Sequence, residues 1–82
     1  MIAPGIAETL LPIDLLKANE EASVVELSGD AKQIHQLAEI GLRVGCSIRM
    51  VCPGYPCVLA VDGRRLSVRL NHEVDVLVST SY

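Results

Sequence analysis

Apolar residues recur at every second position along much of this chain, a pattern typical of β-strands with one buried face and one wet face. The alternation is clearest at residues 46–52, 66–70 and 74–78. Two shorter apolar runs, 22–27 and 58–61, are bounded by turn residues and have the length of a strand. The pattern therefore predicts five strands.

Residues 31–40 follow a helical period instead. Ile34, Leu37 and Ala38 fall at i, i+3 and i+4, which places them on one face of a helix. Asp30 stands directly before this stretch as an N-cap, and a glutamine three positions later can complete a capping box. We therefore expect one short α-helix at about 31–40.

Glycine and proline mark where these elements end. Gly41 stands where a left-handed residue closes a helix, and Gly45 suits a tight turn into the next strand. Asp62 and Gly63 form a strong hairpin signal between two apolar runs. Two prolines and a glycine make residues 52–57 a turn.

Short elements joined by short turns indicate a mainly β protein, a small barrel of about five strands with one short helix. We expect a flexible arm at 1–9, a single domain at 10–79 and a polar tail at 80–82. Near the start of the domain Asp14 can cap one helical turn, and a second such turn is expected at 71–73.

Composition narrows the class of protein. Half of the 82 residues are hydrophobic, but none is Phe or Trp, so the core must be aliphatic. No apolar run approaches the roughly 20 residues of a membrane span, and the N-terminus lacks the basic start of a secretory signal. Three cysteines are an odd number, which fits a reducing compartment better than a disulfide framework. We therefore expect a cytoplasmic location.

The net charge of −3 conceals a basic segment. All five arginines lie between residues 43 and 69, where Asp62 is the one acid, so this segment carries +4 and the remainder −7. The segment is either a docking face for an anionic partner or simply the wet side of the strands. Arginines also contact nucleic-acid phosphates, but two tyrosines are the only aromatic residues. Because stacking platforms are missing, nucleic acid is not the expected partner.

Residues 36–48 combine a helix end, two glycines four positions apart and the start of a strand. This block resembles the FeoA motif, in which a helix ends in leucine-glycine-leucine and a proline-glycine pair leads into a strand. Val44 takes the place of that proline here. The hairpin and the closing strand continue the resemblance over roughly residues 10–79. The resemblance implies an SH3-like β-barrel that accompanies FeoB, the membrane transporter of ferrous iron with a cytosolic GTP-binding domain.

The resemblance also implies a non-catalytic accessory or regulatory protein, held at the membrane only through a FeoB-like GTPase transporter. No glycine-rich phosphate loop with its lysine is present, so we expect no enzyme activity. The expected partner contacts are Leu42, Arg43, Arg64 and Arg65, with core packing as the alternative for Leu42. A nucleic-acid-binding or metal-responsive regulatory module is the alternative function, and an aliphatic chain of this size is also compatible with a homodimer.

An iron-related family directs attention to the thiols and imidazoles. Cys52 and Cys57 flank a tight turn, so they could share Fe(II) or Zn(II), although a structural zinc site needs a second ligand pair that the chain lacks. The alternative is that these cysteines are structural, as small buried hydrophobes. The remaining thiol and the two imidazoles are expected to be structural or solvated: Cys46, His35 and His72.

Overall fold

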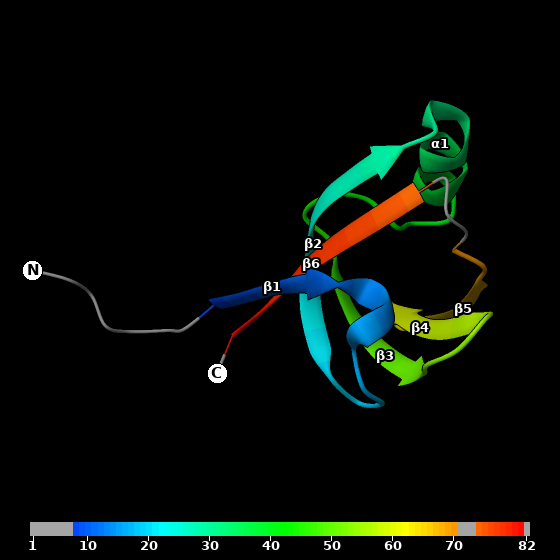
Figure 1. The fold of residues 1–82 in the computed structure, drawn as a ribbon. Helices are drawn as coiled ribbons and strands as arrows, with labels where there is room; N and C mark the ends of the chain where they lie inside the picture. The colour runs from blue at the N-terminus through cyan, green and yellow to red at the C-terminus, as the bar shows by residue number, and fades with distance from the viewer. Residues whose placement is uncertain (1–7, 71–73, 82) are drawn as a thin grey trace, which may run out of the picture.

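In the described part of the chain, six antiparallel strands form a curled sheet around an aliphatic core, and one α-helix lies beside this sheet (Figure 1). The computed structural model describes residues 8–70 and 74–81. In chain order its elements are β1 (Glu8–Pro12), the 3-10 helix η1 (Ile13–Leu15), β2 (Glu21–Gly29), α1 (Ala31–Glu39), β3 (Ser47–Cys52), β4 (Cys57–Val61), β5 (Arg64–Val68) and β6 (Val74–Ser81). The mainly β fold with one short helix is confirmed.

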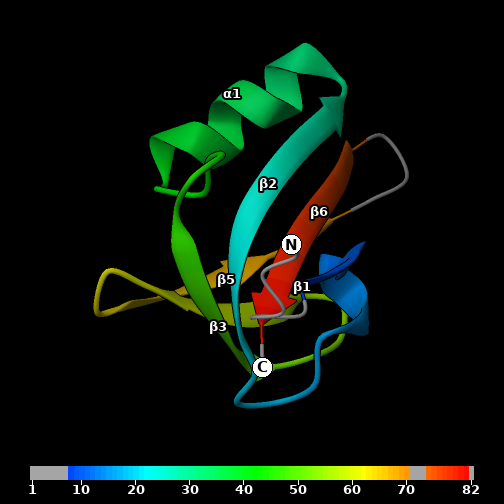
Figure 2. The same ribbon diagram turned by 90° about the vertical axis from the view of Figure 1, so that its left-hand side faces the viewer.

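The strands form one sheet in the order β1-β6-β2-β3-β4-β5. Every pair of neighbours is antiparallel. Figure 2 shows β2 and β6 running side by side through the molecule, with α1 beside β2. In the described residues β1 and β5 are the two ends of this order, so each of them pairs with a neighbouring strand along one edge only.

One strand, β1, was not among the five that the sequence predicted. Its residues show no apolar alternation, and it ends in Pro12. It forms because its backbone pairs with that of β6 in an antiparallel ladder, in which Leu10 stands opposite Ser79. Proline is tolerated there because β1 lies at the edge of the sheet. Glu8 and Thr9 therefore belong to a strand and not to the predicted arm.

Thr80 and Ser81, which the sequence placed in the polar tail at 80–82, belong to β6, because this strand continues through Ser81. Ser79 and Thr80 are polar but buried, since this end of β6 lies between β1 and β2. Two smaller expectations can be compared as well. Asp14 lies inside η1 and does not cap it, because Pro12 occupies the preceding position. The turn expected at 71–73 lies outside the described residues.

Two bulges interrupt the alternation of side chains. In β2 the register shifts between Val24 and Glu26, and in β3 it shifts between Met50 and Cys52. An extra residue at such a point bends the strand and increases its twist. It also reverses which parity faces the core beyond the bulge. The bulges therefore help the short strands to curl, and they decide where the residues after them point.

The core consists of aliphatic side chains with one methionine and one cysteine, as the composition required. The side chains with the least exposure are Leu16, Val24, Leu42, Met50, Leu59, Val61 and Val78. They come from η1 and its flank, from the turn after α1, and from β2, β3, β4 and β6. Chains of this size bury only about 60–70% of the surface that they expose when unfolded, so each core side chain is a large share of the stability.

Helix α1 begins as the sequence predicted. The carboxylate of Asp30 accepts a hydrogen bond of 3.0 Å from the backbone N–H of Gln33, which satisfies one of the free donors of the first turn. On the side of the helix that faces the sheet, Leu37 is buried and Ile34 packs against the core.

The helix ends in a Schellman motif around Gly41, which has φ +105°. The N–H of Gly41 donates to the carbonyl of Ala38 at 3.0 Å, and the N–H of Leu42 donates to the carbonyl of Leu37 at 2.9 Å. This geometry turns the chain back toward the helix, and Leu42 and Leu37 join the same core cluster. The left-handed closing residue predicted at this position is confirmed.

The turn after the helix is fastened to β2. The N–H of Gly45 donates to the carbonyl of Val24 at 2.8 Å, and the N–H of Val24 donates to the carbonyl of Cys46 at 2.9 Å. These two bonds hold the end of the α1 turn against β2 at the residue where the β2 bulge begins. The helix, its stop and the start of β3 therefore form one unit on β2.

We expect Gly41→Ala to lower the free energy of unfolding by about 1–2 kcal/mol, because an L side chain is strained at positive φ. A Cβ at this position would also lie 3.4 Å from Nη2 of Arg64, which would have to move. Urea unfolding measures the loss. Gly41→Asn is the matched variant and should lose less, since asparagine tolerates left-handed conformations better. Equal stability of wild type and Gly41→Ala would contradict the role assigned to Gly41.

Candidate functional site

Two exposed arginines, Arg43 and Arg64, lie at the C-terminal end of α1, and a third, Arg65, follows Arg64 on the opposite face of β5. Arg43 belongs to the turn after the helix, and Arg64 and Arg65 begin β5. The guanidinium of Arg64 lies over Gly41, with its Nη2 3.4 Å from the position that a Cβ would take on this glycine. A cation is favoured at this point because the last carbonyls of a helix carry partial negative charge. The fold thus brings together two basic segments that are about twenty residues apart in the sequence.

Leu42, the fourth predicted partner contact, is not part of this surface. Its side chain is 0% exposed and lies in the core. The physical reason is its place in the Schellman motif, where an apolar residue folds back onto the last turn of the helix. The expectation that Leu42 contacts a partner is therefore corrected to its alternative, core packing. Arg43, Arg64 and Arg65 form no ion pair with any residue that the structure describes.

The thiols of Cys52 and Cys57 point to opposite faces of the sheet. Cys52 stands opposite Val58 in the β3–β4 ladder and is exposed. Cys57 directly precedes Val58 in β4, and its side chain is buried in the core. Neighbouring residues of a strand face opposite sides, so the two thiols do not form the chelating pair that the sequence suggested. The β3 bulge causes this, because without it Cys52 would share the inward parity of Met50.

Burial also makes Cys57 a poor ligand and nucleophile. It raises the pKa of the Cys57 thiol; a backbone hydrogen bond acts in the opposite direction, and Asp14 and Cys52 add smaller upward contributions. A thiol with a raised pKa stays protonated near neutral pH, whereas metal binding and nucleophilic attack need the thiolate. Within residues 8–70 and 74–81, no three His, Cys, Asp or Glu side chains are placed to hold a metal ion.

The other candidate ligands are scattered. Cys46 is half-buried and packs against the core. His35 is exposed on α1 and lies 3.7 Å from the carboxylate of Glu39, one helical turn further on. His72 lies outside the described residues. The arrangement therefore assigns no metal chemistry to these side chains.

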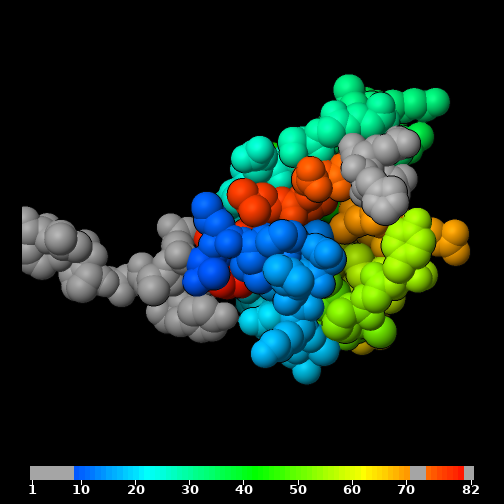
Figure 3. Space-filling view, in the orientation of Figure 1, coloured from blue at the N-terminus to red at the C-terminus, as the bar shows by residue number. Residues whose placement is uncertain are grey.

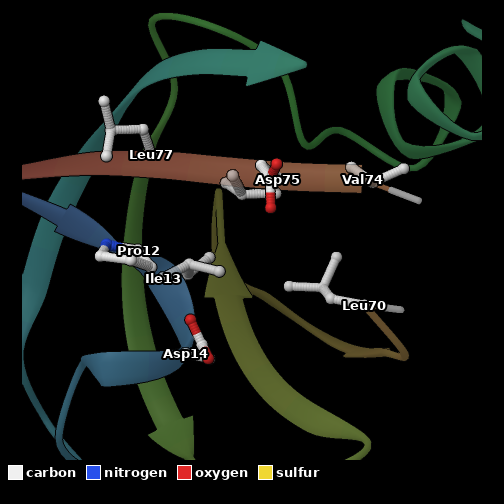
Figure 4. Close-up of a pocket in the computed structure, with 8 residues that line it drawn as sticks. Pro12, Ile13, Asp14, Leu70, Val74, Asp75 and Leu77 are labelled. Carbon is white, nitrogen blue, oxygen red and sulfur yellow. The ribbon is translucent and has the colours of Figure 1, made fainter. Parts of the chain in front are cut away.

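A pocket of about 430 Å³ lies where the end of β1 and η1 face β6 and Leu70, which stands just beyond β5 (Figure 4). Ile13 and Leu70 point toward each other across it, while Asp14 and Asp75 supply carboxylates from opposite sides. In the space-filling view, β1 and η1 form a continuous surface beside the segment that joins β3 and β4 (Figure 3). No local signal marks this pocket, because its walls come from segments that are distant in the sequence.

A smaller hollow of about 230 Å³ lies between α1 and the end of β5. The helix contributes Leu37 with Gln33 and Gln36, and the strand side contributes Val68 and Leu70. We call this hollow the α1–β5 groove. The sequence offered one sign of it, because an exposed isoleucine closes the helix at position 40 and adds an apolar residue beside the groove.

The order of elements around the arginines and the glycine stop can be compared with known families. A model of the FeoA domain matches residues 11–78, which is most of the chain. The chain belongs to the FeoA family. The resemblance carried by residues 36–48 is confirmed.

Among solved structures, this FeoA-family chain is similar to a crystal structure described as an iron uptake regulatory protein (FeoA). The TM-score is 0.77 at 20% sequence identity, and the match covers 90% of this chain and 99% of that chain. At this identity the likeness shows the fold, and it confirms the SH3-like architecture. Comparison with curated proteins gives no significant match. Within the described residues, no helix is long and apolar enough to cross a membrane.

The raised pKa of Cys57 predicts a loss of stability at alkaline pH. Above the ordinary pKa of a thiol the unfolded chain releases this proton while the folded chain retains it, so the free energy of unfolding falls as pH rises. We expect Cys57→Ala to show a shallower decline than wild type between about pH 8 and about pH 10. Chemical unfolding at a series of pH values measures both slopes.

The matched variant is Cys52→Ala, which removes an exposed thiol that contributes only the smallest upward effect on the Cys57 pKa, so its slope should stay much closer to that of wild type than the slope of Cys57→Ala. Identical slopes for all three proteins would show that burial does not perturb the Cys57 thiol.

Proposed function

We propose that this FeoA-family chain is a non-catalytic accessory protein of ferrous iron uptake, which acts in the cytoplasm by binding the cytosolic part of a FeoB-type transporter. Family membership supports the link to ferrous iron transport. The similar crystal structure is described as a regulatory protein of iron uptake, which agrees with an accessory role. In this proposal iron is the cargo of the transporter.

The observation that carries the proposal is a set of exposed arginines at and next to the end of α1, which form no ion pair with any residue in the described part of the chain. Arg43, Arg64 and Arg65 come from two segments that the fold joins, and they are exposed. An acidic face on a partner would find its complement there, which favours rapid and specific association. A buried active site is not required for such a role.

Regulation follows from binding if the partner has two conformations. A protein that binds one conformation of the GTP-binding domain more tightly shifts the population toward it by the ratio of the two affinities. The rigid fastening of the α1 turn to β2 suits this role, because a preformed surface loses little conformational entropy on binding. The arginines would then read the shape and the charge of one state of the transporter.

Nucleic-acid binding uses the same arginines and is the weaker alternative. In the described part of the chain the exposed aromatic residue is Tyr55, which lies in the turn between β3 and β4. Arg43 and Arg64 lie instead at the end of α1. Without stacking beside the arginines, single strands would be held by charge alone, and weakly at physiological salt.

We expect Arg43→Glu to weaken binding to the purified cytosolic domain of a FeoB-type transporter by about tenfold or more, because charge reversal turns attraction into repulsion. Calorimetry measures the affinity, with GTP and GDP states of the domain compared. The thermal midpoint should stay near that of wild type, since Arg43 is exposed and unpaired.

Lys17→Glu is the matched control. Lys17 is an exposed cation in the turn after η1, and this turn lies at the other end of β3, where the N–H of Asn19 donates to the carbonyl of Met50. This variant should keep the affinity of wild type. If Arg43→Glu binds as tightly as wild type, the proposed surface is wrong; if wild type does not bind the domain at all, the proposed partner is wrong.

A further inference from the structure

The outer edge of β5 is a free template for another strand. In the described chain β5 pairs with β4 alone, and no backbone bond from another element reaches residues 64–68 on the other side. Proteins usually protect such an edge, because unpaired N–H and C=O groups readily pair with a further strand. The opposite edge of the sheet, β1, ends in Pro12, which cannot donate to a ladder.

Helix α1 runs alongside this edge at a distance that leaves the α1–β5 groove open. The end of the helix, at Gly41, lies beside Arg64, where β5 begins. The earlier turns of the helix, at Gln33 and Leu37, lie across the groove from Val68, where β5 ends. The groove therefore lies beside residues 67–70, at the C-terminal end of β5, and an added strand would enter between the helix and the edge of the sheet at this end.

The side chains around the edge alternate in chemistry. Leu66, Val68 and Leu70 are buried or half-buried, whereas Arg65 and Arg69 are exposed, and Arg69 also lines the groove. Neither arginine has an acidic partner among the described residues. An added strand would therefore meet apolar surface with one set of its side chains and positive charge with the other.

We propose that β5 and the α1–β5 groove bind an extended acidic segment of a partner protein by strand addition. The segment pairs with the outer edge of β5, places an aliphatic side chain in the groove, and sets its carboxylates against Arg65 and Arg69. Main-chain pairing supplies affinity in such recognition, and alternate side chains supply specificity. The inference rests on the proposed function, because it states how a partner segment is held.

A second copy of the chain does not fit this edge as well. Antiparallel pairing of two β5 strands would bring Arg64, Arg65 and Arg69 of one copy toward the same cations of the other. Like charges on facing strands destabilise the pairing. The arginines therefore disfavour self-association through β5 and favour a segment of opposite charge.

The test uses the full chain and a capped seven-residue peptide with alternating glutamate and aliphatic residues (acetyl-EVELEVE-amide). We expect saturable binding in an NMR titration, with the largest amide shifts at residues 64–70 and on the groove side of α1. Two control peptides separate strand addition from charge attraction. One has the same composition without alternation, and the other carries N-methyl groups on alternate amides, which blocks pairing with β5. Both should bind about tenfold more weakly or worse.

Matched protein variants locate the site. Arg65→Gln and Arg69→Gln should each weaken peptide binding severalfold, whereas Arg49→Gln neutralises an exposed arginine in the middle of the sheet and should have no effect. Gln36→Phe should fill the groove and block the peptide. His35→Phe changes an exposed neighbour on α1 that does not line the groove, and it should leave binding intact.

Several results would overturn the inference. These are no binding at millimolar peptide, equal binding of the control peptides, or shifts located away from β5 and α1. Anionic lipid vesicles or a single-stranded oligonucleotide could also bind, with the same dependence on Arg65 as the peptide. If Gln36→Phe then has no effect, the site is a purely electrostatic surface and the inference is wrong. Binding of the FeoB-type domain without peptide binding would overturn this inference and leave the proposed function standing. Peptide binding without binding of the FeoB-type domain would overturn the proposed function and leave this inference standing.

Discussion

The left-handed stop at Gly41 is the constraint on which the rest of the molecule depends. It ends α1 after nine residues and turns Leu42 into the core, where its side chain is completely buried. The chain then reaches β2 within three residues and is fastened there by two backbone hydrogen bonds. Since β3 starts from this fastened turn, the position of the helix and the register of the sheet are set together. If the helix ended at another residue, neither the position of α1 nor the register of β3 would be fixed in this way.

The two bulges are the second determinant, because they decide which chemistry faces water. In a small barrel the strands must bend strongly, and an extra residue is a common way to achieve this. The bulge in β3 sends Cys52 outward while Cys57 stays in the core. Two thiols that look like a ligand pair in the sequence therefore become one exposed side chain and one core side chain. Curvature, and not any requirement for a metal, accounts for their placement.

The two edge strands, β1 and β5, are the feature that links the fold to the proposed function. A sheet that closes completely has no free edge, whereas here each edge strand has one unpaired side among the described residues. The two edges differ in chemistry: β1 ends in a proline, whereas β5 carries arginines beside the α1–β5 groove. A domain with few buried polar groups and a charged edge strand is suited to hold another chain. The proposed recognition of a partner protein rests on family membership and on arginines that have no ion-pair partner among the described residues.

The sequence by itself determined the local elements: the aliphatic core, the Asp30 cap, the Gly41 stop, and all strands with a regular alternation. It also determined the family, through residues 36–48. These features depend on neighbours within a few positions, so a local pattern is sufficient to predict them. Tertiary structure decided the existence of β1, the full length of β6, the burial of Leu42 and the opposite orientation of the two thiols. Each of these depends on pairing between distant segments, because a strand without alternation forms only where a ladder is offered and a bulge forms only where the sheet must bend.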